Sequence, residues 1–213
     1  MITHDYKLIY IHIPKCAGRS ITDMFNQRFD HCTAQYYQNE YPRQFKQYDV
    51  FTIVRNPYDR YVSMWNYIKN HRRHQKEDIY NQYFDDDRYD FKHWLLKNIF
   101  AYKGGYPATS AEGGRGFDDK IGSAFWFSSQ YSRLSNWNKS LIVPNVFHFE
   151  KMDEVYNFLS ERMEQVAAIP HLNQSKRKEW TYYYDDEIIE HLHKFQPFLT
   201  DIEKLGYELL REV

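Results

Sequence analysis

Short apolar runs alternate with amphipathic stretches along the first third of the chain. Residues 7–13 (KLIYIHI) and 50–54 (VFTIV) are rich in β-branched and aromatic residues, which is typical of buried strands. Each run is followed by a tight polar turn and then by apolar residues at helical spacing, over residues 19–28 and 58–70. This part of the chain is therefore predicted to form two strand–turn–helix units.

The pattern of the remaining chain predicts a third strand and further helices. The strand is expected at residues 146–149 (VFHF), and residues 103–116 are expected to form a loop because they contain five of the eight glycines. Helices are expected over residues 91–100, 123–136, 151–164, 185–194 and 200–205. Strands that alternate with helices predict an α/β fold in which helices flank a central parallel sheet on both faces.

Length and composition narrow the class of protein. A chain of 213 residues fits one domain over residues 1–213. The 28 Lys and Arg balance the 29 Asp and Glu, so the charge gives no reason to expect a nucleic-acid partner. The apolar runs are too short to span a membrane, and the N-terminus lacks the pattern of a signal peptide, so a cytoplasmic protein is expected. The two cysteines, Cys16 and Cys32, have no spacing typical of a metal site.

The turn after the first predicted strand has the features of an anion site. Ligands of parallel α/β sheets bind beyond the carboxyl ends of the strands. Ala17 and Gly18 are small enough for the backbone to wrap closely around a ligand, and the next helix directs its free N–H groups there. Lys15 adds a positive charge and Ser20 a hydroxyl, although Lys15 alone could equally be a surface residue. The lysine precedes the glycine, unlike in a Walker A motif, which disfavours an ATPase or GTPase.

The turn after the second predicted strand has a complementary pair of side chains. Arg55 ends the strand, and Ser63 lies about two turns inside the following helix. The planar guanidinium can hold a phosphate, and the Ser63 hydroxyl can donate to the same group. Arg60 is expected to form a salt bridge with Asp59 or with a carboxylate at the sheet edge.

Together the two turns resemble those of the sulfotransferases that depend on 3′-phosphoadenosine 5′-phosphosulfate (PAPS). The resemblance is to the carbohydrate branch, the heparan sulfate 2-O-type enzymes and their bacterial relatives. Residues 11–20 (IHIPKCAGRS) are similar to the family's 5′-phosphosulfate loop, and residues 52–63 (TIVRNPYDRYVS) to its 3′-phosphate motif. Weaker similarity covers residues 147–152, 170–175 and 201–207. The resemblance implies a P-loop-like sulfotransferase fold and transfer of the PAPS sulfuryl group to a hydroxyl acceptor without a metal.

The resemblance also assigns roles to individual residues. Lys15 would be catalytic, by neutralising the bridging oxygen as 3′-phosphoadenosine 5′-phosphate (PAP) leaves, and His31 would take the proton of the acceptor hydroxyl. Gln130 would contact the acceptor. The residues expected to bind PAPS are Lys15, Cys16, Ala17, Gly18, Arg19, Ser20, Arg55, Ser63, Asn173, Ser175 and Arg177. Cys16 stands where the family often has Thr or Ser, and Arg19 where Thr is common, so either change is expected to weaken one hydroxyl contact to the 5′ group while the backbone cradle stays.

Several alternatives remain open from the sequence. His31 could simply pack a loop, which would leave Asp59 and Glu150 as bases, although the resemblance makes both of these structural. The chain could be a non-catalytic module that binds anions or glycans on the same fold, or a small-molecule kinase that uses Mg²⁺ and ATP. A carbohydrate acceptor follows from the resemblance, and the 19% aromatic content suits sugar stacking. The composition equally permits a lipid, a small alcohol or a peptide tyrosine.

Overall fold

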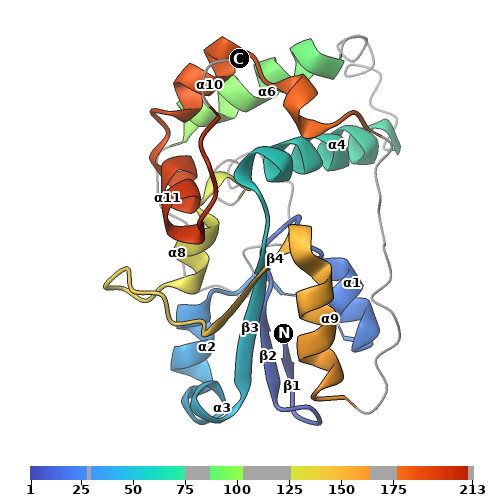
Figure 1. Cartoon of the computed structure of the whole chain (residues 1–213), viewed down its shortest axis with the longest axis vertical. Coiled ribbons are helices and arrows are strands. Elements are labelled where there is room, and N and C mark those ends of the chain that lie inside the picture. The colour runs from blue at the N-terminus through green and yellow to red at the C-terminus, as the bar shows by residue number, and fades with distance from the viewer. Residues whose placement is uncertain (28–29, 75–86, 103–125, 164–176, 211–213) are drawn as a thin grey trace.

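A four-stranded sheet lies at the centre of the protein (Figure 1). The computed structural model describes residues 1–27, 30–74, 87–102, 126–163 and 177–210. The strands, in spatial order, are β1 (Ile2–Thr3), β2 (Leu8–Ile11), β3 (Asp49–Val54) and β4 (Asn145–His148). Strands β2, β3 and β4 are parallel, as predicted, whereas β1 is an antiparallel edge strand that the sequence pattern did not predict. The expected α/β class is confirmed.

Helices cover both faces of this sheet and continue beyond its carboxyl end (Figure 1). Helices α1 (Gly18–Met24) and α9 (Met152–Ser160) lie on one face. Helices α2 (Ala34–Glu40), α3 (Pro42–Gln47) and α8 (Gln130–Leu134) lie on the other. Helices α4 (Pro57–His74), α6 (Asp87–Ala101) and α10 (Asp186–Leu192) lie beyond the strand ends, and α11 (Gln196–Leu205) packs against α8. Two short 3₁₀ turns, η1 (Phe149–Lys151) and η2 (Trp180–Tyr183), complete the described elements.

The buried side chains form two clusters, one around the sheet and one among the helices beyond it. The sheet cluster contains β-branched and aliphatic residues of β2 and β3, for example Ile9, Ile11 and Ile53. The second cluster is mainly aromatic and includes Tyr58 and Phe198. The loops that leave β2 and β3 run between the two clusters, so their polar side chains lie at the junction.

Most predicted elements occur, with shifted ends. The strand at 50–54 and the helices at 58–70 and 91–100 match β3, α4 and α6 closely. Within the described residues the helix predicted over 123–136 is interrupted: residues 126–127 are helical, and α8 begins only at Gln130. Helix α11 begins earlier than predicted, at Gln196. Helices α2 and α3 were missed. The loop predicted at 103–116 lies outside the described residues.

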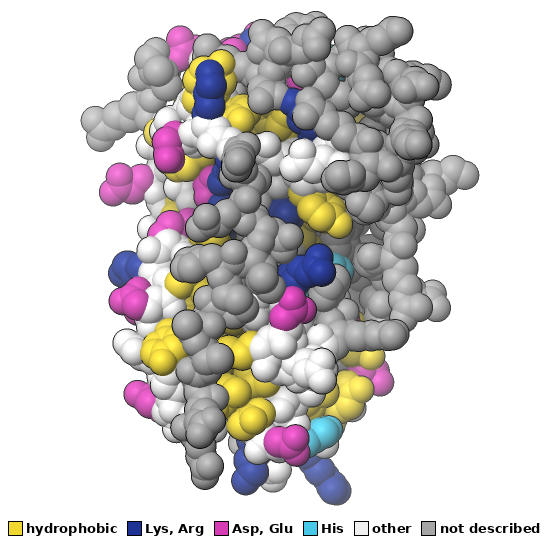
Figure 2. All heavy atoms as spheres, turned by 90° about the vertical axis from the view of Figure 1, so that its right-hand side faces the viewer, with side chains coloured by type: hydrophobic (Ala, Val, Ile, Leu, Met, Phe, Trp, Pro, Cys, Tyr) yellow, Lys and Arg dark blue, Asp and Glu magenta, His cyan; other side chains and the backbone are white. Residues whose placement is uncertain are grey.

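Acidic and basic side chains do not form separate patches on the face of the protein shown in Figure 2. In Figure 2, acidic and basic side chains of the described residues are interspersed with small groups of hydrophobic ones.

None of the helices within the described part of the chain combines the length and the apolar character needed to cross a membrane.

Candidate active site

The first loop turns sharply between β2 and α1. Lys15 (φ 71°) and Ala17 (φ 57°) both adopt left-handed backbone conformations, which are unfavourable for residues with a Cβ atom. The side chain of Cys16, between them, points into the protein. Its thiol approaches the Pro14 carbonyl oxygen (3.7 Å) and Gln130 Oε1 (3.3 Å). The side chain at position 16 therefore secures the loop from inside, and the lost hydroxyl that the sequence suggested is replaced by an inward thiol contact.

Gly18 is required by the interior of the protein as well as by the loop. A Cβ atom at this position would lie 1.7 Å from Nε2 of His12, whose ring is buried at the end of β2. From sequence, the small residue was expected to make room for a ligand on the other side of the backbone. The structure adds a steric reason from behind.

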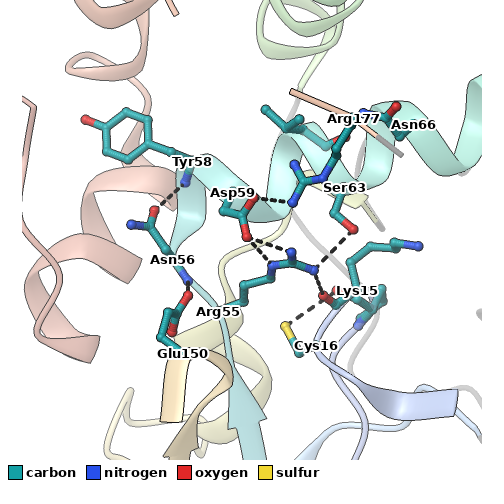
Figure 3. A network of polar contacts seen from close by, with 12 residues as sticks. Lys15, Cys16, Arg55, Asn56, Tyr58, Asp59, Ser63, Asn66, Glu150 and Arg177 are labelled. Carbon is teal, nitrogen blue, oxygen red and sulfur yellow. Dashed lines mark hydrogen bonds and ion pairs between the residues drawn. The ribbon is translucent and has the colours of Figure 1, made fainter. Parts of the chain in front are cut away.

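Arg55 lies where β3 ends and links the two loops (Figure 3). Its Nη1 donates to the Lys15 carbonyl oxygen (3.1 Å) and to Ser63 Oγ (3.2 Å). Its guanidinium also lies 4.1 Å from the centre of the Phe149 ring. The sequence predicted that Lys15, Arg55 and Ser63 serve one site, and the structure brings these three residues together.

Asp59 holds two guanidinium groups at once. Its Oδ2 accepts from Arg55 Nε (2.7 Å) and Nη2 (2.6 Å), and its Oδ1 pairs with Arg177 Nη2 (Figure 3). The prediction that Arg60 pairs with Asp59 is wrong, and within the described residues Arg60 has no ion pair with another carboxylate either. The Arg60 side chain is fully buried, and it donates to the carbonyl oxygens of Pro14 (3.2 Å) and Trp126 (3.1 Å). Arg60 therefore supports the backbone of the first loop.

The positive charges of the site outnumber its negative ones. Burial, followed by the neighbouring Arg55, lowers the pKa of Lys15 to about 8. The Lys15 ammonium lies 4.3 Å from the centre of the Tyr67 ring. Nη1 of Arg177 is buried and has no hydrogen-bond partner among the described residues. Two guanidinium groups share one carboxylate and the Lys15 ammonium lies near them, so this excess of positive charge, with a donor left over, suits an anionic ligand.

His31 lies behind the first loop, packed on His12. The two imidazole rings are 4.5 Å apart at an angle of 32°. Burial, followed by the positive charge of Arg133, lowers the pKa of His31 to about 4, so its ring is neutral at pH 7. Arg133 also donates to the His31 carbonyl oxygen (3.3 Å). The same low pKa makes the ring a weak proton acceptor, and its contact with His12 fits the alternative in which His31 packs a loop.

Gln130 is completely buried at the start of α8. Its Oε1 accepts from the Arg55 N–H (3.0 Å), and its Nε2 donates to the Arg55 carbonyl oxygen (2.8 Å). In this structure its side chain presents no surface to an acceptor, which does not fit the substrate contact that the resemblance assigned to it.

The other expected site residues differ in exposure. The Arg19 side chain is 68% exposed and pairs with Asp23 (3.8 Å), whereas Ser20 is buried in α1. The alternative base Glu150 accepts from the Asn56 N–H (2.8 Å) and from the Tyr207 hydroxyl (3.1 Å). Asn173 and Ser175 lie outside the described residues.

With this geometry established, comparison with known proteins decides the family. The family model described as "Sulfotransferase family" matches residues 1–208. The chain belongs to the sulfotransferase family. No curated protein and no solved structure matches the chain.

One feature of this sulfotransferase site was not predicted from sequence. Tyr67 presents a 41% exposed ring beside Lys15, and its ring centre lies 6.3 Å from that of Trp126. Tyr67 follows Ser63 by four positions, and residues four apart share one face of a helix. That spacing was a signal available in the sequence.

No group of three or more His, Cys, Asp or Glu side chains placed to hold a metal ion occurs among the described residues.

Proposed function

We propose that this protein transfers the sulfuryl group of PAPS to a hydroxyl group of a carbohydrate. The proposal depends chiefly on Arg55, which bonds to the first loop at Lys15 and to the second motif at Ser63. Two turns that could each hold one anionic group therefore face a shared space. PAPS carries such groups at both ends of its ribose.

The residues of the site fit this donor. The buried Arg177 Nη1 lacks a partner among the described residues, and burial, followed by the neighbouring cations, lowers the pKa of Lys15 to about 8. A phosphate would satisfy the free donor and relieve the repulsion between cations. Arg55, Ser63 and Arg177 would hold the 3′-phosphate. The first loop, from Lys15 to Ser20, would hold the 5′-phosphosulfate, and Asn173 and Ser175 are proposed as further nucleotide contacts.

Transfer requires one bond to break and one to form. The bond between sulfur and the bridging oxygen of the 5′-phosphate breaks, and the acceptor oxygen bonds to sulfur. The protonated Lys15 stabilises the electron pair left on the bridging oxygen. The acceptor hydroxyl must also lose its proton, and His31 is proposed as the base, with Asp59 and Glu150 as the alternatives. Positioning and positive charge supply the catalysis, as they do in phosphoryl transfer.

The aromatic pair beside Lys15 supports a carbohydrate acceptor. The exposed ring of Tyr67 lies beside the Lys15 ammonium, and the partly exposed Trp126 lies next to Tyr67. Sugar rings have apolar faces with polar edges, and exposed aromatic rings match such faces. Tyr67→Ala is therefore expected to raise KM for the acceptor and to leave the affinity for PAP unchanged.

The direct test combines binding with turnover. Calorimetry should detect PAP binding, and labelled PAPS should transfer its sulfuryl group to one class within a panel of glycans, phenols, small alcohols and lipid alcohols. Lys15→Ala should abolish transfer in a folded protein, whereas Arg55→Ala should chiefly weaken PAP binding. Transfer that survives Lys15→Ala would overturn the mechanism. PAP binding without any transfer would indicate a binding module, and Mg²⁺-dependent use of ATP would indicate a kinase.

A further inference from the structure

The side-chain amide of Gln130 takes the place of a neighbouring strand for Arg55. Arg55 follows the last residue of β3, so the sheet ladder that pairs β3 with β4 ends at Val54. Gln130 then supplies both partners of the next residue: its Oε1 accepts from the Arg55 N–H (3.0 Å) and its Nε2 donates to the Arg55 carbonyl oxygen (2.8 Å). A primary amide matches a peptide group because each has a donor and an acceptor.

The same oxygen reaches the first loop. Gln130 Oε1 lies 3.3 Å from the Cys16 thiol, on the loop that carries Lys15. One buried amide thus contacts both loops of the site. Arg55 Nη1 makes a second link, to the Lys15 carbonyl oxygen. The separation between the two anion-binding loops is therefore fixed at Gln130.

Gln130 is itself fixed from helix α11. Asp201 is buried, and its carboxylate accepts from the backbone N–H groups of Gln130 (2.9 Å) and Tyr131 (3.0 Å). It also accepts from the hydroxyl of Ser129 (2.6 Å). These bonds cap the first turn of α8, so Gln130 has little freedom to move.

We propose that Gln130 is a positioning residue that orients Arg55 and thereby sets the preference of the site for a nucleotide with a 3′-phosphate. It replaces the acceptor contact suggested by sequence resemblance. The inference rests on the proposed function, in which Arg55 holds that phosphate. The Arg55 guanidinium already donates to Asp59, to the Lys15 carbonyl oxygen and to Ser63, so few of its N–H groups remain for a phosphate and their direction depends on the position of its backbone.

Asn145, on the neighbouring strand β4, provides a matched control at the other end of β3. Its Nδ2 donates to the Val50 carbonyl oxygen (3.0 Å), near the start of β3. It is also a side-chain amide that bonds to the backbone of β3, yet it lies far along the strand from Arg55. Replacing Asn145 should lower the stability of the protein without displacing Arg55.

The test compares Gln130→Met with Asn145→Leu. Each protein is titrated with PAP and with adenosine 5′-phosphate, which lacks the 3′-phosphate, and the ratio of the two dissociation constants gives the preference. Gln130→Met is expected to reduce the wild-type preference about tenfold or more, since misplacement of a binding group by about 1 Å has large effects. Asn145→Leu should change it by less than about twofold. Unfolding midpoints of both variants show whether stability alone explains the result.

The outcomes separate this inference from the proposed function. A wild-type protein that does not prefer PAP would refute the proposed function. A clear wild-type preference that Gln130→Met retains would refute the positioning role alone. If Gln130→Met fails to fold, hydrogen exchange of the wild-type protein decides the question. The Arg55 amide should exchange about a hundredfold or more slowly than an unprotected amide, and exchange near the unprotected rate would overturn the inference.

Discussion

At the scale of single residues, Gly18 is constrained by the ring behind it. The position that a Cβ atom would take lies 1.7 Å from Nε2 and 2.0 Å from Cδ2 of His12. Real Cβ atoms do not approach other atoms so closely, and His12 is buried with no free space to enter.

Gly18→Ala is therefore expected to lower the free energy of unfolding by about 1–3 kcal/mol through overpacking. Urea denaturation measures this loss. The double variant His12→Ala/Gly18→Ala should recover part of it, because the clash is removed. Gly206→Ala is a control with open space around the Cβ position, where only the positive φ of 73° costs stability. Equal losses with and without His12 would contradict the steric explanation.

Lys15 should titrate within the working range of the site. Burial and then Arg55 lower its pKa to about 8, well below the usual value of a lysine. The ammonium is present below this pKa and is lost as the pH rises through it. The affinity for PAP is expected to fall above about pH 8, by up to about tenfold per pH unit.

Calorimetric titrations with PAP from pH 6.5 to pH 9.5 would measure this change. Lys15→Met should bind PAP more weakly and should lack the decrease above about pH 8. A decrease of the same size in Lys15→Met would assign the titration to another group.

At the scale of elements, the start of α8 depends on a carboxylate from α11. Asp201 accepts from the Ser129 hydroxyl and from the N–H groups of Gln130 and Tyr131, while burial raises its own pKa. Helix α8 has only five residues, so its first turn has few other sources of stability.

Asp201→Ala is expected to cost about 2–4 kcal/mol, because it leaves several buried donors unsatisfied. Asp185→Ala offers a matched cap variant, since Asp185 accepts from the Ile188 N–H (3.1 Å) at the start of α10 in a more exposed place. Its cost should be nearer about 1 kcal/mol. Chemical denaturation of both proteins gives the comparison, and a smaller loss for Asp201→Ala would show that α8 does not need this cap.

Some helices could be predicted from their sequences more clearly than others. Helix α4 was predicted because apolar residues recur on one face at helical spacing. Helices α2 and α3 were missed because they are short and polar. Their boundaries nevertheless carry ordinary signals: the Thr33 hydroxyl accepts from the Tyr36 N–H, and Pro42 occupies the first turn of α3.

At the scale of the whole molecule, buried neutral histidines couple folding to pH. Burial and then Arg133 lower the pKa of His31 to about 4, and burial and then His31 lower that of His12 well below its usual value. In the unfolded chain both rings should titrate near pH 6.5. Between pH 4 and pH 6.5 the unfolded chain therefore binds more protons than the folded protein, so stability falls as the pH decreases.

Each histidine should contribute up to about 1.4 kcal/mol per pH unit in this window. Urea denaturation at several values between pH 7 and pH 4.5 would measure the slope. His31→Asn should reduce it, whereas His4→Asn, at an exposed position, should not. An unchanged slope in His31→Asn would show that this ring does not stay neutral in the folded protein.

The sequence by itself determined the α/β class, the strands β2, β3 and β4, and the two loops with Lys15, Arg55 and Ser63. These features depend on residues close together in the chain: apolar runs, turn residues and helical spacing are local. Only the tertiary structure decided how Asp59 pairs with Arg177, 118 positions away, and how Gln130 bonds to Arg55, 75 positions away. Neither contact leaves a local pattern, because a buried hydrogen bond requires two distant segments to meet, and that meeting is set by packing of the sheet and helices around them.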